Sequence, residues 1–407
     1  MLKNINIILK RYISNLVKYR KNKDNARNFS VWVFGEWFGT KCSDNVLAFA
    51  NYVAQSTENL DLYWICNNEC DTNPLSKKVK ILKRDSAEAI EIQKIAGVAI
   101  MNQGYDDFSS LGDNYLGNAI TINLWHGVMW KKIGFDTYDR TKMISRFYIN
   151  SIKKTKECKM FVAPSLEYEN YFKNAFALQS SKPIHAGLPR NEIMFDSKQI
   201  GDARKLLEKR ISLKLGTSVG KGMKIITYMP TFRDKVSQEF SFSMLLKNKS
   251  FLKLIDDYNI IIIQKAHEAN IRRGENFGAN YSNRILNIQD IQPQILLAGS
   301  DILITDYSSC FFDFLLLDRP IIFYMYDYLY YANKDRGFYF LKEDILCGLS
   351  PENEIELISA IQKTLNKDEY SNIRRKIRDK YMTFERESNC ELIFEKIEDE
   401  ITRVTIS

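Results

Sequence analysis

Residues 301–324, with the sequence DILITDYSSCFFDFLLLDRPIIFY, constrain the fold of this chain more than any other stretch. They read as a short strand, a polar turn, an apolar helix and a second strand, with few residues between them. The first run, Ile302 to Ile304, is apolar throughout, as expected of a strand in a parallel sheet covered by helices on both faces. The pattern therefore predicts a βαβ step within an α/β fold.

The same alternation of strand-like and helix-like segments continues along most of the 407 residues, a length that suits two domains. The glycine-rich segment 216–222 has the composition of a linker. We therefore expect a first α/β domain over residues 28–215 and a second over residues 223–350. Residues 351–407 are charged and helical in pattern, and we expect them to pack on both domains.

Residues 1–27 form a basic arm with eight Lys or Arg and one acidic residue, in a chain of net charge +8. Apolar residues from Leu2 to Val17 recur at three- and four-residue steps, which predicts an amphipathic helix. Such a helix suits the surface of an anionic membrane, since Lys10 and Arg11 interrupt the apolar run before it reaches spanning length. Packing against its own domain or a partner is the alternative. Because the net positive charge lies on this arm and the rest of the chain carries little, we expect no nucleic-acid partner.

The sequence contains no pattern typical of a metal site. Its seven cysteines lack paired metal-ligand spacing, and no dense carboxylate cluster suited to Mg²⁺ or Mn²⁺ is present. Reduced cysteines and an absence of metal cofactors are therefore expected.

Two of the three histidines follow predicted strands. His126 comes after the strand 120–124 of the first domain, and His267 comes after the strand 260–263 of the second. Open α/β sheets bind ligands at the carboxyl ends of their strands, and imidazole titrates near neutral pH. The two histidines are therefore candidates for an acid/base pair that faces a cleft between the domains. Either histidine alone is more often structural.

Two neighbouring strand ends in the second domain carry cationic groups suited to phosphate. Thr231 and Arg233 follow the strand 224–229, and Lys265 follows the next strand. An Arg guanidinium offers phosphate oxygens a planar fork, whereas a Lys ammonium acts as a point charge. A surface ion pair between Arg233 and Asp234 is the alternative.

The turn after the strand 302–304 supplies a third set of phosphate-binding groups. It contains Asp306, Ser308 and Ser309 at the start of the predicted helix 310–317. The unpaired N–H groups at a helix start attract anions, and the two serine hydroxyls add donors. The alternative for Ser308 is a helix cap.

Six ordered segments between about residues 30 and 385 resemble the CDP-glycerol glycerophosphotransferase family of teichoic-acid and capsule synthesis. They are LWHGVMWKKIGFD at 124–136, GLPRNE at 187–192, YMPTFRD at 228–234, KAH at 265–267, LITDYSSCFFDFLLLDRPIIFY at 303–324 and RGFYF at 336–340. The resemblance implies two Rossmann-like lobes in a GT-B arrangement, an acceptor lobe followed by a CDP-donor lobe. It also implies peripheral attachment to the cytoplasmic face of the bacterial inner membrane.

The implied activity is transfer of a polyol phosphate, foremost glycerol phosphate, from a CDP-alcohol to a hydroxyl of a lipid-linked saccharide or growing polymer, with release of CMP and without a cofactor. The resemblance makes His126 the base that removes the acceptor proton, and His267 a contact of the donor phosphates. It assigns the pyrophosphate to Thr231, Arg233, Ser308 and Ser309, with Lys265 and the Asp306 turn beside them. On the acceptor side the candidates are Lys131, Lys132 and Arg190.

Two positions depart from the family's usual pattern: Val128-Met129 stands where Thr-Pro is usual, and Glu268 stands where Pro is usual. A GT-B glycosyltransferase that uses a nucleotide sugar is one alternative function. A catalytically silent, membrane-attached binding module is another. No motif distinguishes glycerol from ribitol, identifies the acceptor, or separates single addition from polymerisation.

Overall fold

The computed structural model describes residues 22, 25–137, 156–217, 222–231, 240–265, 282–334 and 337–406. The helix predicted from the apolar residues Leu2 to Val17 of the basic arm thus lies outside the described residues. Internal contacts divide the chain into two compact units. Unit 1 contains the segment that ends at His126, Lys132–Glu192 and the segment that starts at Thr383, and unit 2 contains Gly127–Lys131 and Ile193–Met382.

Unit 1 contains a sheet whose described strands all run parallel, in the order β3-β2-β1-β4-β5-β6-β7. The order reverses between β1 and β4, which is the position where open α/β sheets form a crevice for ligands. The bounds are β1 Asn28–Phe34, β2 Asp61–Cys66, β3 Lys80–Lys83, β4 Ala96–Met101, β5 Ile120–Asn123, β6 Met160–Ala163 and β7 Lys182–His185.

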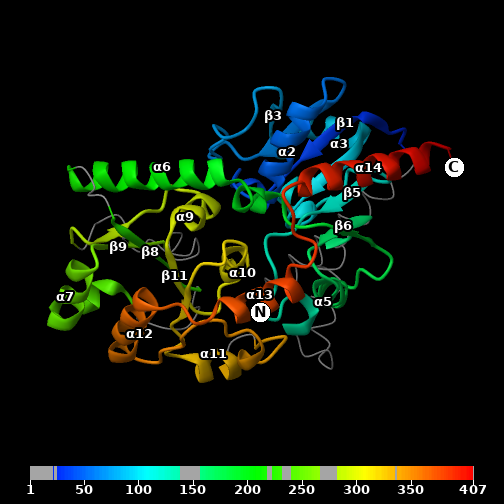
Figure 1. Cartoon of the computed structure of the whole chain (residues 1–407). Helices are drawn as coiled ribbons and strands as arrows, with labels where there is room; N and C mark the ends of the chain where they lie inside the picture. The colour runs from blue at the N-terminus through cyan, green and yellow to red at the C-terminus, as the bar shows by residue number, and fades with distance from the viewer. Residues whose placement is uncertain are drawn as a thin grey trace, which may run out of the picture. The chain divides into compact units, whose positions relative to one another are not determined.

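Unit 2 contains a second parallel sheet, in the order β10-β9-β8-β11-β12 among the described strands. Its first strand β8 lies beside its fourth strand β11, so the order reverses as it does in unit 1. The bounds are β8 Lys224–Met229, β9 Ile260–Gln264, β10 Ile285–Asn287, β11 Ile302–Thr305 and β12 Ile321–Phe323. The predicted α/β fold with parallel sheets is confirmed (Figure 1).

The strands of unit 2 are apolar on both faces because each face packs on its own layer. Ile260 and Ile262 belong to a core cluster with residues of α7 and α12. Ile261 and Ile263 belong to another cluster with residues of α6 and α9. This division explains the continuous apolar run of β9, which is typical of parallel sheets with helices on both sides.

The helices start where the sequence supplies side chains that cap them. Ser86, Ser165 and Asn353, for example, accept hydrogen bonds from backbone N–H groups in the first turns of α3, α5 and α12. Within the described ranges, no helix is both long enough and apolar enough to cross a membrane. The bounds are α2 Asn45–Ser56, α3 Ala87–Ile95, α5 Leu166–Phe176, α6 Ser197–Leu215, α7 Lys249–Asp257, α9 Pro293–Gly299, α10 Cys310–Leu315, α11 Tyr328–Lys334, α12 Glu354–Asn366, α13 Ser371–Tyr381 and α14 Asn389–Ile406.

The last helix, α14, returns to unit 1 and completes its core. Ile393 and Ile397 lie in one cluster with Trp32 of β1 and with apolar residues of α2. The Phe394 ring packs against Trp32, with the ring centroids 5.6 Å apart. Figure 1 shows α14 alongside the strands of this sheet. By contrast, α12 and α13 belong to unit 2.

Helix α6 lies in unit 2, which corrects the predicted boundary at residues 215–216. Leu207 and Ile211 are fully buried in the cluster that covers β8 and β9. Arg204 donates to the carbonyl of Met223 at 2.6 Å and to the carboxylate of Asp301 at 2.7 Å. The amphipathic pattern shows that α6 has a buried face, but it does not identify the sheet that this face covers. The contact boundary therefore falls at Glu192–Ile193.

Replacing Leu207 by Ala tests this assignment. The change removes buried apolar contacts, so we expect a loss of about 2 to 5 kcal/mol of stability in unit 2. Native-state hydrogen exchange should become faster in β8 and β9 and stay unchanged in β1 and β4. Leu213→Ala on the same helix is the control, because the Leu213 side chain is 64% exposed. Faster exchange confined to unit 1 would contradict the assignment.

Candidate active site

His126 follows β5 at the carboxyl end of the unit 1 sheet, as predicted. The loop turns sharply after the strand, where Asn123 accepts a hydrogen bond from the backbone N–H of Trp125 at 2.8 Å. The imidazole packs against two indoles, with centroid distances of 4.1 Å to Trp125 and 4.9 Å to Trp37. His126 is half-buried. Residues from the ends of two strands, β1 and β5, therefore position this ring.

Gln103, which follows β4, provides a side-chain partner for the imidazole. Its amide nitrogen lies 3.0 Å from Nδ1 of His126. The Gln103 backbone N–H donates to Asp107 at 2.7 Å, and its carbonyl accepts from Lys156. Since β4 lies between β1 and β5 in the sheet, three adjacent strand ends contribute to the surroundings of His126.

Asp107 holds the loops that follow β1 and β4 together. Its buried carboxylate accepts from the backbone N–H groups of Phe38 at 2.8 Å, Asn102 at 2.9 Å and Gln103 at 2.7 Å. Asn102 in turn accepts from the backbone N–H of Trp37 at 2.9 Å. These bonds satisfy backbone donors that would otherwise be buried without partners.

Three aromatic residues around His126 have left-handed backbone conformations. The φ angles are 47° for Trp37, 60° for Phe38 and 51° for Trp125. Such angles are unfavourable for bulky residues, at roughly 1 to 3 kcal/mol each, and they cluster at functional sites where the surroundings enforce them. The hydrogen bonds to Asn102 and Asn123 are part of that enforcement.

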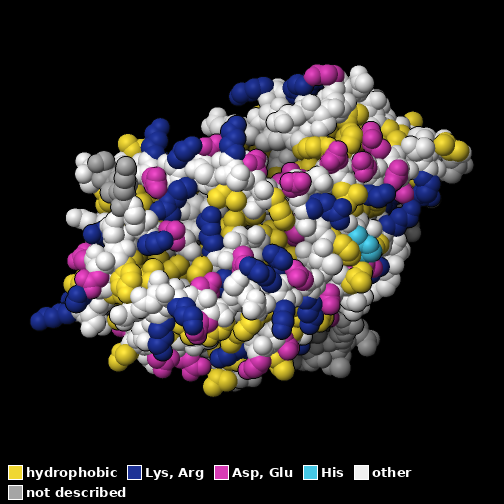
Figure 2. Space-filling view, in the orientation of Figure 1, with side chains coloured by type: hydrophobic (Ala, Val, Ile, Leu, Met, Phe, Trp, Pro, Cys, Tyr) yellow, Lys and Arg dark blue, Asp and Glu magenta, His cyan; other side chains and the backbone are white. Residues whose placement is uncertain are grey.

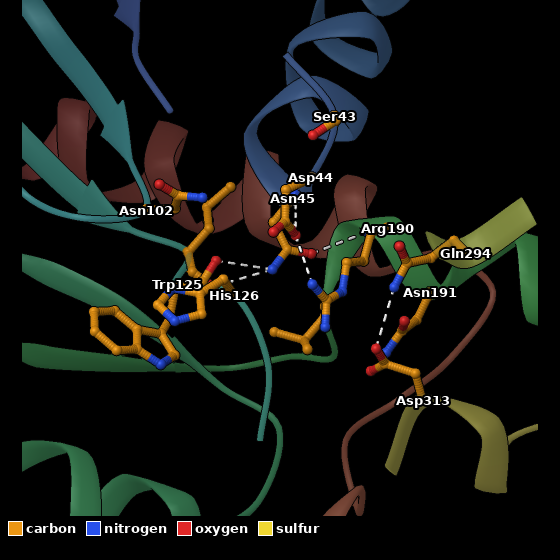
Figure 3. Close-up of polar contacts among 12 residues, drawn as sticks. Ser43, Asp44, Asn45, Asn102, Trp125, His126, Arg190, Asn191, Gln294 and Asp313 are labelled. Atoms are coloured by element: carbon orange, nitrogen blue, oxygen red, sulfur yellow. Dashed lines mark hydrogen bonds and ion pairs between the residues drawn. The ribbon is translucent and has the colours of Figure 1, made fainter. Parts of the chain in front are cut away.

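Arg190, a predicted acceptor-side residue, makes a buried ion pair in unit 1 (Figure 3). Its guanidinium donates to Asp44 at 2.8 Å, and the two side chains are only 11% and 7% exposed. Asp44 also accepts from the Trp37 indole N–H at 3.0 Å. Asn45 joins the same network by donating to the carbonyl of Trp125 at 2.9 Å and accepting from the Arg190 backbone N–H at 3.1 Å. Arg190 therefore stabilises the loops that hold His126.

Two buried acids near these loops have raised pKa values. Burial raises the pKa of Asp107 to about 7, although its three backbone hydrogen bonds and Lys156 act in the opposite direction. Burial also raises the pKa of Glu36 well above its usual value, and the neighbouring Asp44 adds to this effect. Glu36 is fully buried and accepts from the backbone N–H groups of Ser43 and Leu47.

In unit 2, the predicted phosphate-binding segments follow three adjacent strands, β9, β8 and β11. Thr231 and Asp306 contact each other directly, because the Asp306 carboxylate accepts from the Thr231 backbone N–H at 2.8 Å. The Thr305 hydroxyl also donates to the Met229 carbonyl at 2.7 Å. Asp306 is fully buried. Its carboxylate therefore links two loops, and the cationic and hydroxyl groups around it remain the candidates for anion contacts.

The remaining predicted residues of unit 2 have varied environments. Ser308 and Ser309 are half-buried just before α10, and the Ser308 hydroxyl lies 3.5 Å from the Cys310 backbone nitrogen. Lys265 is 8% exposed and donates to the Gln289 carbonyl at 2.7 Å. His267 and Arg233 lie outside the described residues, so the predicted pairing of two histidines stays a prediction.

The segment after His126 belongs to unit 2. Trp130 stacks on Phe338 with a centroid distance of 4.4 Å, and its indole N–H donates to the Phe340 carbonyl at 3.1 Å. Lys131 forms an antiparallel backbone bridge with Phe338. Lys132 is half-buried in unit 1. Phe338 and Phe340 thus anchor the chain a few residues beyond His126.

The sequence analysis missed Gln103, Trp37 and Asp107. Each follows a predicted strand of unit 1 or lies in the loop after it, so a survey of polar and aromatic residues at every strand end would have included them.

Within the described ranges, no group of three or more His, Cys, Asp or Glu side chains could hold a metal ion. Acidic and basic side chains are intermingled on the face shown in Figure 2.

Comparison with known proteins identifies the family of this chain. The family model described as CDP-glycerol:poly(glycerophosphate) glycerophosphotransferase matches residues 16–399. A teichoic acid poly(glycerol phosphate) polymerase of Bacillus spizizenii is 27% identical over 360 residues, covering 85% of this chain and 86% of that protein. A teichoic acid glycerol-phosphate transferase of Staphylococcus aureus is 29% identical over 249 residues, covering 60% of this chain and 61% of that protein.

The fold is also similar to that of a solved structure, the wall teichoic acid polymerase TagF. The TM-score is 0.75 at 21% identity, and the match covers 98% of each chain. At this identity the likeness establishes the fold alone. It agrees with the parallel sheets described above.

The raised pKa of Asp107 predicts how the stability of unit 1 depends on pH. Its pKa of about 7 in the folded protein exceeds the ordinary value of 3.8, so the folded state binds this proton more tightly than the unfolded chain does. The resulting stabilisation is complete below the ordinary pKa and is lost as the pH rises through about 7. Thermal unfolding monitored by unit 1 probes should therefore show a fall in Tm over this range.

Asp107→Asn should lower the Tm and flatten its dependence on pH, since the amide cannot titrate and offers one acceptor oxygen in place of two. Asp196→Asn is the control, because Asp196 is an exposed carboxylate whose pKa is lowered by its hydrogen bonds with Gln199. An Asp107→Asn profile parallel to that of the unchanged protein would contradict the raised pKa.

Proposed function

Because the chain belongs to the CDP-glycerol:poly(glycerophosphate) glycerophosphotransferase family, as the six sequence segments predicted, we propose that it transfers a polyol phosphate from a CDP-alcohol to an acceptor hydroxyl and releases CMP. Glycerol phosphate is the transferred group that the family description favours. The acceptor is a lipid-linked saccharide or a growing teichoic-acid-like or capsular polymer. The names of the relatives, a poly(glycerol phosphate) polymerase and a glycerol-phosphate transferase, support this choice.

The observation that carries the proposal is the placement of His126 at a strand end, in contact with two indoles and with Gln103. His126 takes the proton of the acceptor hydroxyl as its oxygen attacks the phosphorus that bears the polyol. A new P–O bond forms, the bond between this phosphorus and the bridging oxygen breaks, and CMP leaves with the electron pair. Orientation and charge stabilisation supply most of the rate in phosphoryl transfer, so a rigidly held base is useful.

On the donor side, we propose that Thr231, Lys265, Ser308 and Ser309 contact the diphosphate of the CDP-alcohol, with Arg233 and His267. Backbone N–H groups, hydroxyls and cations neutralise the phosphate charge, so the reaction needs no metal or other cofactor. Asp306 supports this set by linking the loops after β8 and β11. The two units adopt the GT-B arrangement in this proposal, with unit 1 as the acceptor lobe.

We propose that the enzyme acts at the cytoplasmic face of the bacterial inner membrane as a peripheral protein. The support is the basic, amphipathic pattern of residues 1–27. Apolar side chains on one helical face enter the headgroup region, and Lys and Arg contact anionic lipids. This placement brings the site to a lipid-linked acceptor.

A donor panel with His126→Ala tests the reaction. With a suitable acceptor, CDP-glycerol should yield CMP, and nucleotide sugars should yield no transfer. Removing the base should lower kcat by about 10² to 10⁴-fold while CDP-glycerol binding measured by calorimetry persists. The control is His185→Ala, since His185 pairs with Glu169 at 2.7 Å and stacks on Phe384. Sugar transfer with release of a nucleoside diphosphate would establish the glycosyltransferase alternative, and no turnover with any donor would establish the silent module.

Deletion of residues 1–23 tests the membrane placement. The intact chain should sediment with vesicles rich in phosphatidylglycerol, less so at high salt, and weakly with phosphatidylcholine vesicles. The shortened chain should remain in the supernatant and keep its activity on a water-soluble acceptor. Unchanged sedimentation of the shortened chain would remove the role of the arm.

A further inference from the structure

We propose that Gln103 is a positioning residue that orients His126 and determines which of its ring nitrogens is basic. This inference rests on the proposed role of His126 as the base of the transfer reaction. It adds a residue that lies outside the six segments shared with the family, and it makes a neutral amide the partner of the catalytic imidazole.

The contact is short and its surroundings hold it. The Gln103 side-chain nitrogen lies 3.0 Å from Nδ1 of His126, and Gln103 is only 6% exposed. Its backbone is fixed on both sides, because its N–H donates to Asp107 and its carbonyl accepts from Lys156. The amide is therefore presented to the ring from a main chain with little freedom.

The imidazole itself is restrained on its faces. Trp125 lies against it at 4.1 Å with an interplanar angle of 30°, and Trp37 lies against it at 4.9 Å with an angle of 44°. Neighbours on its faces limit tilting, and a hydrogen bond at Nδ1 fixes rotation about the Cβ–Cγ bond. Since Gln103 engages Nδ1, the nitrogen assigned to the reaction is Nε2.

The role of His126 as a base determines which tautomer of its neutral ring is required. For Nε2 to take a proton, the neutral ring must carry its hydrogen on Nδ1, which then donates to an acceptor. A half-turn of the Gln103 side-chain amide exchanges its oxygen and nitrogen, so the Gln103 oxygen Oε1 then lies 3.0 Å from Nδ1 of His126 in place of the amide nitrogen. In this orientation Oε1 accepts from Nδ1–H both before and after Nε2 is protonated. Gln103 can therefore hold one ring orientation through the whole proton transfer.

The choice of an amide also affects basicity. A carboxylate in this position would favour the imidazolium, whereas an amide orients the ring without adding a charge. The charged groups in the loops around this arrangement include Lys156 and Asp107 on the Gln103 backbone, and the Asp44–Arg190 pair that contacts Trp37. Glu36 lies near Asp44 and Asp107, and the Lys41 ammonium lies 5.6 Å from the centroid of the Trp37 ring. An amide adds no further charge to these groups.

Three variants test the proposal in the full-length protein. Gln103→Leu removes the hydrogen bond and should lower kcat roughly 10- to 100-fold with little change in KM for CDP-glycerol. Gln103→Glu restores an acceptor and should recover most of kcat while shifting the acidic limb of the pH–rate profile to higher pH. The control Gln93→Leu removes another buried glutamine of unit 1, which is 1% exposed and bonds to the Ala89 carbonyl. It should leave the pH profile unchanged.

A spectroscopic measurement separates this inference from the proposed reaction. Histidine-selective ¹⁵N labelling reports the tautomer of each of the three histidines, and His126→Ala assigns the signal. The intact protein should show His126 with its proton on Nδ1 near neutral pH, and Gln103→Leu should shift the population toward Nε2–H. This readout needs no turnover, so it remains valid if the substrate is a different one.

The outcomes are distinct. A Gln103→Leu protein with an unchanged tautomer, kcat and pH profile overturns the role of Gln103 even if His126→Ala is inactive. A tautomer shift together with a fully active His126→Ala protein supports the positioning contact but overturns the role of His126 as base. If Gln103→Leu does not fold, Gln103→Glu and its shifted pH profile decide the question.

Discussion

Buried carboxylates that accept backbone hydrogen bonds hold the strand-end loops of both units together. In unit 1, Asp107 joins the loops after β1 and β4. In unit 2, Asp306 joins the loops after β8 and β11. In each sheet these are the two strands at which the order reverses. Each carboxyl oxygen can accept more than one hydrogen bond, so a buried carboxyl group can fix loop backbone that has no partners in a strand ladder.

The surroundings of His126 depend on this scaffold. Trp37 reaches the imidazole from a loop that Asn102 and Asp107 hold in a left-handed conformation. Trp125 is held by Asn123, which accepts from its backbone N–H, and by Asn45, which donates to its carbonyl. A site with restrained aromatic neighbours suits a reaction in which positioning supplies much of the rate. The strain in the three aromatic residues is consistent with this demand, since the scaffold maintains conformations that the residues themselves disfavour.

Much of the fold was predictable, because strands that are buried on both faces have short, continuous apolar sequences. β8 at Lys224–Met229 and β11 at Ile302–Thr305 match the expected segments, and His126 occurs at the end of β5 as expected. The polar strand β7 was missed, since Lys182–His185 contains a proline and has little apolar pattern. Residues 197–215, which form α6, were placed in the first domain, because a periodic apolar pattern shows that a helix has a buried face but does not identify the sheet that this face covers.

Side-chain partners were the least predictable part of the site. Arg190 was expected on the acceptor side, yet its guanidinium pairs with Asp44, which lies 146 residues earlier in the chain. Gln103 and His126 are 23 residues apart and meet only because β4 and β5 are neighbours in the sheet. Local sequence patterns carry no information on such pairings. Once the strand order is known, however, the residues that follow adjacent strands can be identified as candidates for side-chain contacts with one another.

The return of α14 to unit 1 has a consequence for the order in which the protein forms during synthesis. Ile393 and Ile397 share a core cluster with Trp32, so this core cannot be completed before α14 has been translated. The two core clusters of unit 2 draw their buried residues from Leu207 to Ile361 and are complete earlier. Domains translated first generally fold first. Here the residues of both unit 2 core clusters are translated before α14, so the core of unit 1 can be completed only after those residues are available.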